Sequence, residues 1–395
     1  MTTRRLILTR SAALVGAAST GLLLPQMARA QGSKVRVGLM LPYTGTFAQL
    51  GVAIENGVRM AIDEKGGKLG GREIEWFKVD DESEPSKGVE NASKLVQRDK
   101  VDVLIGTVHS GVQMGIQKVA RDSGVLSIIP NAGVHAATRA LCAPNVFRTS
   151  FTNSQPTLAL GKAMVDRGHK KAVWITWKYA AGDEAFEGFR DSYTAAGGTI
   201  VKELGLPFPN VEFQALLTEI ASLKPDAVAC FFAGGGAAKF IRDYAAAGLK
   251  GKIPLYGSGF LTEGVLDAAG PAADGIVTTM HYSDSLDTPR NKKFRLDYAK
   301  TFRMQPDVYA VQGYDSGQLL VQGAAAVKGD LANKQALYKA MESATIDSPR
   351  GKWTMSKSHN PVQDMYLRVV ENKENKVIGI AAKALADSGA GCKMG

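Results

Sequence analysis

The sequence is poor in the features that mark metal centres, nucleic-acid interfaces and membrane spans. It contains only three cysteines and five histidines in 395 residues, and the histidines show no metal-ligand spacing, so we expect no metal site and no cofactor. The net charge of +10 comes from scattered Lys and Arg without interleaved aromatics, which argues against nucleic-acid binding. No apolar stretch reaches the roughly 20 residues that a membrane-spanning helix needs.

Motifs for nucleotide binding and nucleophilic catalysis are absent as well. The glycine run Gly234-Gly235-Gly236 has neither the lysine nor the hydroxyl residue of a phosphate-binding loop. No G-x-S-x-G sequence occurs, and no motif places an acid to orient a histidine. We therefore predict that the protein is not an enzyme and has no catalytic residues. An exported α/β hydrolase stays as a distant alternative.

The chain does begin with the features of a secretion signal. The pair Arg4-Arg5 precedes an apolar run over residues 12–24, and an A-x-A sequence ends at Ala30. A charged start, a short apolar centre and this ending are typical of a signal peptide cleaved after Ala30. The arginine pair favours twin-arginine export, with an ordinary Sec signal as the alternative. We expect a periplasmic protein.

The three cysteines divide into one core residue and two others. Cys230 lies in the apolar sequence Ala-Val-Ala-Cys-Phe-Phe, which is typical of a buried strand. Cys142 and Cys392 lie outside such patterns. In an oxidising compartment they are candidates for a disulfide, and two free thiols are the equally weighted alternative.

Apolar, β-branched segments alternate with helical periodicity along the chain, and this rhythm restarts near residue 150. The expected strands are 35–41, 74–79, 101–105, 125–129, 172–176, 199–204, 227–232, 254–256, 275–280, 364–370 and 376–380. The expected helices are 48–65, 86–97, 111–122, 185–195, 213–223, 237–247, 290–302, 309–327 and 333–341. Such alternation predicts an α/β fold with two similar halves, each a parallel sheet flanked by helices.

Ligands of open α/β sheets bind outside the carboxyl ends of the strands. Small and polar residues follow three strands of the first half, and the candidate ligand-binding residues there are Tyr43, His109, Ser110, Asn131, Ala132 and Gly133. Ser110 is the best candidate for an anion anchor, because a hydroxyl at a helix start lies beside free N–H groups and the positive end of the helix dipole. A plain N-cap is its structural alternative.

The second half repeats the arrangement, with aromatic residues beside glycines at the strand ends. The candidate ligand-binding residues there are Tyr179, Ala181, Gly234, Gly259, Phe260 and Tyr282. Aromatic rings next to glycines suit a wall that a flat apolar ligand approaches closely. Packing between the halves and ordinary turn glycines are the alternative interpretation.

Several of these motifs occur in the order found in a known family. They are Pro42-x-Thr44-Gly45, Gly51-x-x-x-x-x-Gly57, Gly106-x-x-x-Ser110, Pro130-Asn-Ala-Gly133, Phe147-Arg-Thr-Ser150, Tyr179-Ala-Ala-Gly182 and Tyr314-Asp315. Together they resemble the periplasmic leucine/isoleucine/valine-binding proteins, the solute receptors of ABC importers. The similarity covers essentially the whole chain after the signal.

The resemblance implies two Rossmann-like lobes, joined by three crossovers, that close on a small ligand and deliver it to membrane permease subunits. The crossovers are expected near Ser150, near Met280–Ser283 and near Ser348–Lys352. The implied organisation is a signal peptide at 1–30, a first lobe at 31–150 and 284–345, a second lobe at 151–283 and 353–383, and a C-terminal tail at 384–395. A monomer is expected.

Departures from the family pattern point to the ligand. In amino-acid-binding members, a serine at the position of Ser110 and a threonine at that of Gly133 hold the α-carboxylate, and an acid near Gly259 pairs with the ammonium. This chain keeps Ser110 and lacks the other two, and a buried ammonium without an anionic partner is costly. The resemblance therefore favours an aromatic acid, such as a benzoate or phenylpropanoid, with a branched-chain or other amino acid as the alternative. Glu263 is the residue that would supply the missing acid.

Overall fold

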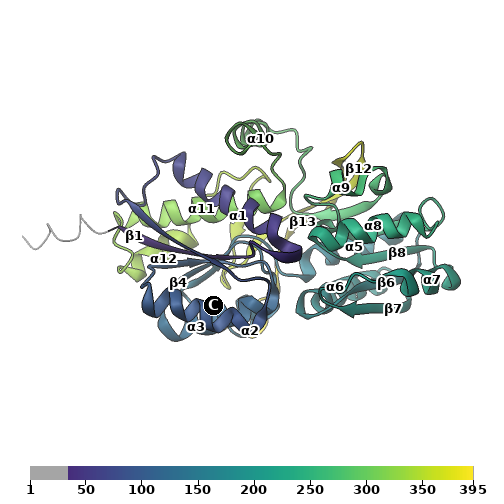
Figure 1. Cartoon of the computed structure of the whole chain (residues 1–395), viewed down its shortest axis with the longest axis horizontal. Helices are drawn as coiled ribbons and strands as arrows, with labels where there is room; N and C mark the ends of the chain where they lie inside the picture. The colour runs from purple at the N-terminus through teal and green to yellow at the C-terminus, as the bar shows by residue number, and fades with distance from the viewer. Residues whose placement is uncertain (1–33, 395) are drawn as a thin grey trace, which may run out of the picture. The chain divides into compact units, whose positions relative to one another are not determined.

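Two β-sheets organise the chain, which is described here from a computed structural model covering residues 34–394. The signal peptide expected at residues 1–30 lies outside the described residues. Each sheet has its own set of helices, and Figure 1 shows the two sets as separate halves.

The first sheet is parallel throughout, with the strand order β2-β1-β3-β4-β5. Its strands are β1 (Val35–Leu41), β2 (Ile74–Asp80), β3 (Val103–Ile105), β4 (Leu126–Ile129) and β5 (Val146–Arg148). Its helices are α1 (Ala48–Asp63), α2 (Pro85–Ser93), α3 (Ser110–Ser123), α4 (His135–Thr138), α10 (Pro289–Phe302), α11 (Val308–Ala326) and α12 (Lys334–Glu342). Helices α1 and α11 pack together on one face of this sheet, and α2 and α3 pack together on the other (Figure 1).

The second sheet is mixed, with the order β11-β12-β10-β9-β8-β6-β7 and β13 beside β12. Its strands are β6 (Lys171–Lys178), β7 (Thr199–Pro207), β8 (Ala227–Phe231), β9 (Leu255–Ser258), β10 (Val277–Met280), β11 (Thr354–Met355), β12 (Pro361–Glu371) and β13 (Glu374–Leu385). Its helices are α5 (Ser154–Asp166), α6 (Ala180–Ala195), α7 (Gln214–Leu223), α8 (Gly234–Ala246) and α9 (Leu266–Ala269). Strands β6 to β10 are parallel, and the β12–β13 hairpin joins them antiparallel.

Short turns complete the described chain. They are the 3₁₀ turns η2 (Gly45–Phe47), η4 (Gly259–Leu261) and η5 (Gly270–Ala273), and the π-helical turn η3 (Lys94–Arg98) that extends α2.

The order of elements makes the chain pass between the halves three times. It leaves the first sheet after β5, returns after β10 to form α10, α11 and α12, and goes back to the second sheet at β11. This confirms the predicted fold class of two α/β lobes with three crossovers. The exact lobe boundaries given above stay a prediction.

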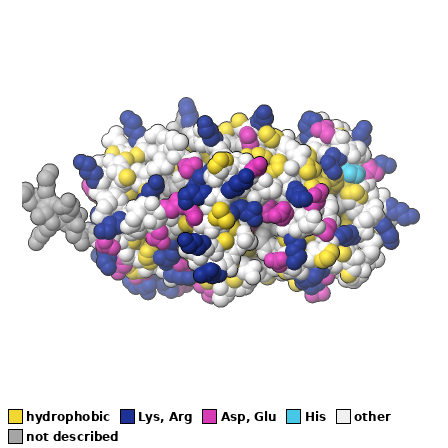
Figure 2. Space-filling model, turned by 90° about the horizontal axis from the view of Figure 1, so that it is seen from above, with side chains coloured by type: hydrophobic (Ala, Val, Ile, Leu, Met, Phe, Trp, Pro, Cys, Tyr) yellow, Lys and Arg dark blue, Asp and Glu magenta, His cyan; other side chains and the backbone are white. Residues whose placement is uncertain are grey.

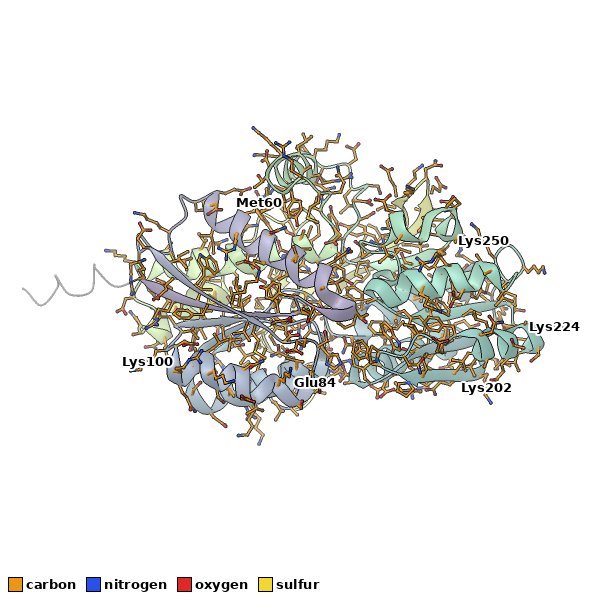
Figure 3. All side chains as sticks on the ribbon, in the orientation of Figure 1. Met60, Glu84, Lys100, Lys202, Lys224 and Lys250 are labelled. Atoms are coloured by element: carbon orange, nitrogen blue, oxygen red, sulfur yellow. A yellow bond between two sulfur atoms is a disulfide. The ribbon has the colours of Figure 1, made fainter. Side chains whose placement is uncertain are left out.

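The strand composition follows from burial on both faces. Strand β8 is apolar at every position and buried throughout, as expected for a parallel strand covered by helices on both sides. Cys230 lies in it as a buried free thiol. The side-chain view in Figure 3 shows the space between sheets and helices filled.

The surface agrees with the scattered charge in the sequence. Figure 2 shows Lys and Arg interspersed with Asp and Glu on the face seen from above. Among residues 34–394, no helix combines the length and the apolar character that crossing a membrane would require.

Candidate functional site

A cavity lies where the strand ends of the two halves face each other. About 300 Å³ of space between atoms, open solvent included, lies between lining residues from both lobes. Its lining residues are Phe47, Leu50, Val108, Ser110, Asn131, Gly133, Phe151, Asn153, Tyr179, Ala181, Phe231, Ala233, Phe260 and Tyr309. Most are aromatic or aliphatic, and none of these described lining residues carries a charge. The cavity thus suits a small, flat ligand held by a few polar groups.

Ser110 is one of the polar residues that line this cavity. It is the first residue of α3, so its hydroxyl lies at the positive end of the helix dipole. The Ser110 hydroxyl accepts a hydrogen bond of 3.2 Å from Nδ2 of Asn153. A hydroxyl has one donor hydrogen besides its acceptor lone pairs, so the hydrogen of Ser110 is available for an anionic ligand atom.

Two phenols add polar groups to the cavity. Tyr179 precedes α6, and Tyr309 is the second residue of α11. The Tyr309 hydroxyl is buried and has no hydrogen-bond partner in the described protein. Burial raises the pKa of both phenols, so both stay protonated and act as hydrogen-bond donors. An unpaired buried hydroxyl costs about 1–3 kcal/mol, which a ligand oxygen would offset.

His109 lies beside the cavity and not in its wall. Its ring stacks on Tyr179 with 4.9 Å between centroids, and it lies equally close to Phe208, so it joins the lobes. Its Nδ1 accepts from the backbone N–H of Gly111 and caps α3. Burial lowers the pKa of His109 to about 4, although the negative charge of Glu84 acts to raise it. Figure 3 shows Glu84 near the place where the two halves meet.

Asn131 is held in place by hydrogen bonds between buried side chains. One of its N–H groups donates to Oε1 of Gln312 at 2.7 Å. The Gln312 amide nitrogen lies 3.2 Å from Nε2 of His281, which belongs to the second crossover. Asn131 therefore contacts the cavity and is tied through Gln312 to the segment that connects the lobes.

Gly133 is small because another side chain fills the space beside it. A Cβ atom there would lie 2.3 Å from Oδ1 of Asn153 and 2.7 Å from the ring of Phe151. A threonine could not occupy this position without displacing Asn153. Asn153 is the side chain that contacts the Ser110 hydroxyl here.

The region around Gly259 contains an internal ion pair. A Cβ at Gly259 would lie 2.5 Å from Nη2 of Arg368, so its side-chain direction leads to that guanidinium. Arg368 forms a buried ion pair with Glu263, whose other oxygen accepts from the backbone N–H of Val308 at 3.0 Å. Glu263 is therefore engaged within the protein and does not line the cavity.

Six predicted ligand-binding residues line the cavity, and six do not. Those that line it are Ser110, Asn131, Gly133, Tyr179, Ala181 and Phe260. Those that the structure places outside its wall are Tyr43, His109, Ala132, Gly234, Gly259 and Tyr282. The second group follows strand ends as expected, but neighbouring residues direct their side chains elsewhere.

Tyr43 and Tyr282 show why the rings turn away. The Tyr43 ring lies under the Lys78 ammonium, 3.8 Å from its centroid, and faces a cluster of charged residues. The Tyr282 hydroxyl donates to Oδ1 of Asn291 at 2.9 Å. The Tyr282 hydroxyl thus has a partner away from the cavity, and the Tyr43 ring packs against Lys78, so neither side chain is among the lining residues.

Backbone contacts account for Ala132 and Gly234. The N–H of Ala132 donates to the carbonyl of Thr107 at 2.9 Å, which positions the loop after β4. Gly234 has φ +56°, and a Cβ there would lie 2.5 Å from the Thr46 carbonyl. Glycine is thus required at Gly234 for a close approach of the lobes.

Sequence reasoning did not select eight of the lining residues, which are Phe47, Leu50, Val108, Phe151, Asn153, Phe231, Ala233 and Tyr309. Val108, Phe231 and Ala233 lie at predicted strand ends, and the other five lie elsewhere in the chain. Phe151 and Asn153 directly follow the crossover motif that ends at Ser150, so that motif was an available signal. Tyr309 lies at the start of α11, whose position over the cavity depends on the tertiary fold.

Two of the three cysteines form a disulfide in the structure and are not free thiols. Cys142 and Cys392 are bonded, with 5.5 Å between their Cα atoms and 250 residues between them in sequence. Cys142 lies between α4 and β5, in the first lobe.

The two α/β lobes and the cavity between them define a two-lobed solute-binding protein. A family model described as periplasmic binding protein matches residues 34–375, and the chain belongs to this family. Membership implies an exported, periplasmic protein.

Three relatives illustrate the similarity. A solute-binding protein of an ABC transporter from R. palustris, solved in complex with benzoate, is 54% identical, with a TM-score of 0.89 and coverage of 91% of this chain and 100% of its own. One from Rhodopseudomonas palustris BisB5, in complex with 3,4-dihydroxybenzoic acid, is 32% identical, with a TM-score of 0.85 and coverage of 90% and 99%. The Leu/Ile/Val-binding protein homolog 6 of Brucella abortus strain 2308 is 29% identical over 86% of this chain and 88% of its own.

Proposed function

We propose that this protein is the receptor of an ABC importer that binds an aromatic carboxylate of the benzoate class and delivers it to the permease. It acts without catalysis, as a monomer, after export through a signal cleaved at Ala30. The two similar solute-binding proteins solved with benzoate and 3,4-dihydroxybenzoic acid support this ligand class.

The observation that carries the proposal is the chemistry of the cavity wall. Phe47, Phe151, Phe231 and Phe260 supply rings, while the polar groups are hydroxyls and amides without charge. A benzoate ring would lie among the phenylalanines, where aromatic pairs contribute about 0.5–1.5 kcal/mol beyond buried area. Its carboxylate would accept from Ser110 at the start of α3.

An amino-acid ligand fits this wall less well. The ammonium group would be buried without a carboxylate among the lining residues, because Glu263 is paired with Arg368. Desolvating a charge without a partner costs several kcal/mol. The cavity therefore favours an acid that lacks an amino group, although curated relatives are named for leucine, isoleucine and valine binding.

Calorimetry on the purified protein tests the proposal. We expect benzoate or 4-hydroxybenzoate to bind and leucine and valine not to bind. A ligand present at 100 times its Kd should raise the free energy of unfolding by about 2.7 kcal/mol. Tight binding of leucine or valine, with no heat from any aromatic acid, would refute the assignment.

The anchor is tested by a matched pair of serine variants. Ser110→Ala removes a hydrogen bond to a charged group, worth about 1.5–3 kcal/mol, or roughly a ten- to hundredfold rise in Kd. Ser222→Ala on α7 removes an exposed hydroxyl that bonds to the carbonyl of Glu219 and should leave Kd unchanged. Equal affinities for the two variants would mean that the carboxylate is bound elsewhere.

A further inference from the structure

The end of the chain returns to the lobe in which the chain began. Strand β13 belongs to the second sheet and ends at Leu385. Residues 386–392, here called the C-terminal strap, then lead to the disulfide between Cys392 and Cys142. Cys142 lies in the first lobe, between α4 and β5. The strap is thus a fourth covalent connection between the lobes, besides the three crossovers.

Asp387 holds the strap against the first lobe. Its side chain is 1% exposed and pairs with Arg139, with 2.7 Å between Nη2 and Oδ2. The hydroxyl of Thr152, at the start of the second lobe, donates to the same oxygen at 2.9 Å. Burial alone would raise the pKa of Asp387, but the hydrogen bonds from Arg139 and from the N–H of Gly389 hold it below its usual value. The carboxylate therefore stays charged and fixed.

A hydrogen-bond network continues from the strap to the ligand cavity. Arg139 Nη1 lies 3.0 Å from Nδ1 of His135, whose backbone N–H donates to Oε2 of Glu184 at 2.9 Å. Glu184 belongs to α6 of the second lobe and accepts at 2.8 Å from Asn153. Asn153 is the residue that donates to Ser110. The network crosses from lobe to lobe between the strap and the proposed anchor.

We propose that the C-terminal strap limits how far the lobes open, and that its disulfide thereby sets the rate at which ligand leaves. The inference rests on the proposed function, in which the lobes close on a ligand. Residues 386–392 span at most about 25 Å when extended, and the disulfide adds 5.5 Å between the Cα atoms of Cys392 and Cys142. Together they bound the separation of Leu385 and Cys142. Without the disulfide, only Asp387 and its neighbours hold the strap, and the lobes can separate further.

Restricting the open state raises the affinity without any new ligand contact. The apparent Kd equals the intrinsic Kd divided by the fraction of molecules in the binding-competent state. A wider set of open arrangements lowers that fraction through conformational entropy. Breaking the disulfide should therefore weaken binding and speed dissociation, even though Cys142 and Cys392 do not line the cavity.

The test compares the double variant Cys142→Ser/Cys392→Ser with Cys230→Ser, which removes the buried free thiol. Small-angle scattering of the ligand-free protein should give a larger radius of gyration for the double variant only. Stopped-flow release of benzoate should be severalfold faster for it, and Asp387→Asn should shift both readouts in the same direction. Wild type treated with a phosphine reductant provides the same comparison without mutation, and circular dichroism verifies that it stays folded.

The outcomes separate this inference from the proposed function. An unchanged free-state radius and unchanged benzoate release, with only a lower Tm, would show that the disulfide merely stabilises the fold and would overturn the inference. If wild type binds no aromatic acid while its free-state radius grows on reduction, the ligand assignment fails and the limit on opening stands.

Discussion

Glu263 and Arg368 form a buried ion pair behind the cavity, with 4% and 0% of their side chains exposed. Arg368 also donates to the carbonyl of Tyr282 at 2.7 Å, so the pair connects η4, the second crossover and β12. Its guanidinium occupies the region toward which the side-chain direction of Gly259 leads. Glu263, which sequence reasoning considered as a partner for a ligand ammonium group, is therefore already paired within the protein.

Removing the cation of this pair should destabilise the protein strongly. Arg368→Met leaves the Glu263 carboxylate buried and unpaired, which costs about 3–5 kcal/mol of unfolding free energy. Lys376→Met is the control on the same hairpin, because Lys376 and Glu371 form an exposed pair of the kind worth about 1 kcal/mol or less. Urea unfolding measures both variants, and similar midpoints would contradict the structural role assigned to Arg368.

The unpartnered hydroxyl of Tyr309 should contribute directly to affinity. Tyr309→Phe keeps the ring and removes the donor, and a hydrogen bond to a carboxylate is worth about 1.5–3 kcal/mol. We expect roughly a ten- to hundredfold higher Kd for benzoate by calorimetry. Tyr244→Phe serves as control, since its hydroxyl bonds to the carbonyl of Ile253 and lies outside the cavity. Unaltered affinity of Tyr309→Phe would show that this hydroxyl does not contact the ligand.

Binding should depend on pH through Glu184. Burial raises its pKa to about 7, against the lowering effect of hydrogen bonds from Asn153 and His135 and of the charges of Arg148 and Arg139. Below pH 7 the carboxyl is mostly neutral, and above it the group is anionic, one hydrogen-bonded residue away from the ligand carboxylate at the proposed anchor. Repulsion should therefore raise Kd by up to about tenfold as the pH increases through 7.

Two variants on α6 isolate this effect. Glu184→Gln should make the Kd for benzoate flat between pH 5.5 and 8.5. Glu187→Gln removes a half-exposed carboxylate from the same helix and should retain the wild-type pH profile. A wild-type Kd that falls as the pH rises through 7 has the opposite sign and would exclude Glu184 as the controlling group.

Restoring the amino-acid-type threonine should damage the site. Gly133→Thr places its Cβ in the space of Asn153 and Phe151, and such overpacking typically costs about 1–3 kcal/mol. We expect a lower Tm together with loss of benzoate binding, because Asn153 positions Ser110. Gly379→Thr in β13 is the matched control, since nothing lies within 4 Å of a Cβ there. A Gly133→Thr protein with wild-type Tm and affinity would show that Asn153 moves without penalty.

The secondary structure was predictable where strand-like and helix-like sequence patterns alternate regularly. Most predicted strands and helices lie within a few residues of the observed ones because apolar, β-branched runs alternate with helical periodicity. Helix α5 was missed because its first half, residues 154–161, is almost entirely buried and lacks the polar face that gives a 3.6-residue period. Its exposed residues Lys162 and Asp166 lie in the second half. Strand β5 is too short to show a pattern of its own.

The site was predictable only where strand ends point into the cavity. Ser110, Asn131 and Gly133 follow consecutive strands of one sheet, so the rule for open α/β sheets found them. The same rule also selected Tyr43 and Tyr282, whose side chains have other partners. A position after a strand determines where the backbone of a residue lies, but not which neighbours its side chain contacts.

The sequence by itself determined the α/β class and the family resemblance, and it selected Ser110 at the start of a helix as the candidate anchor, because these depend on local patterns and on residue identity. Tertiary structure decided which rings line the cavity, brought Asn153 and Tyr309 into its wall, and paired Glu263 with Arg368. It also brought Cys392 to Cys142 across 250 residues. Each of these depends on contacts between segments far apart in the chain, which no local pattern specifies.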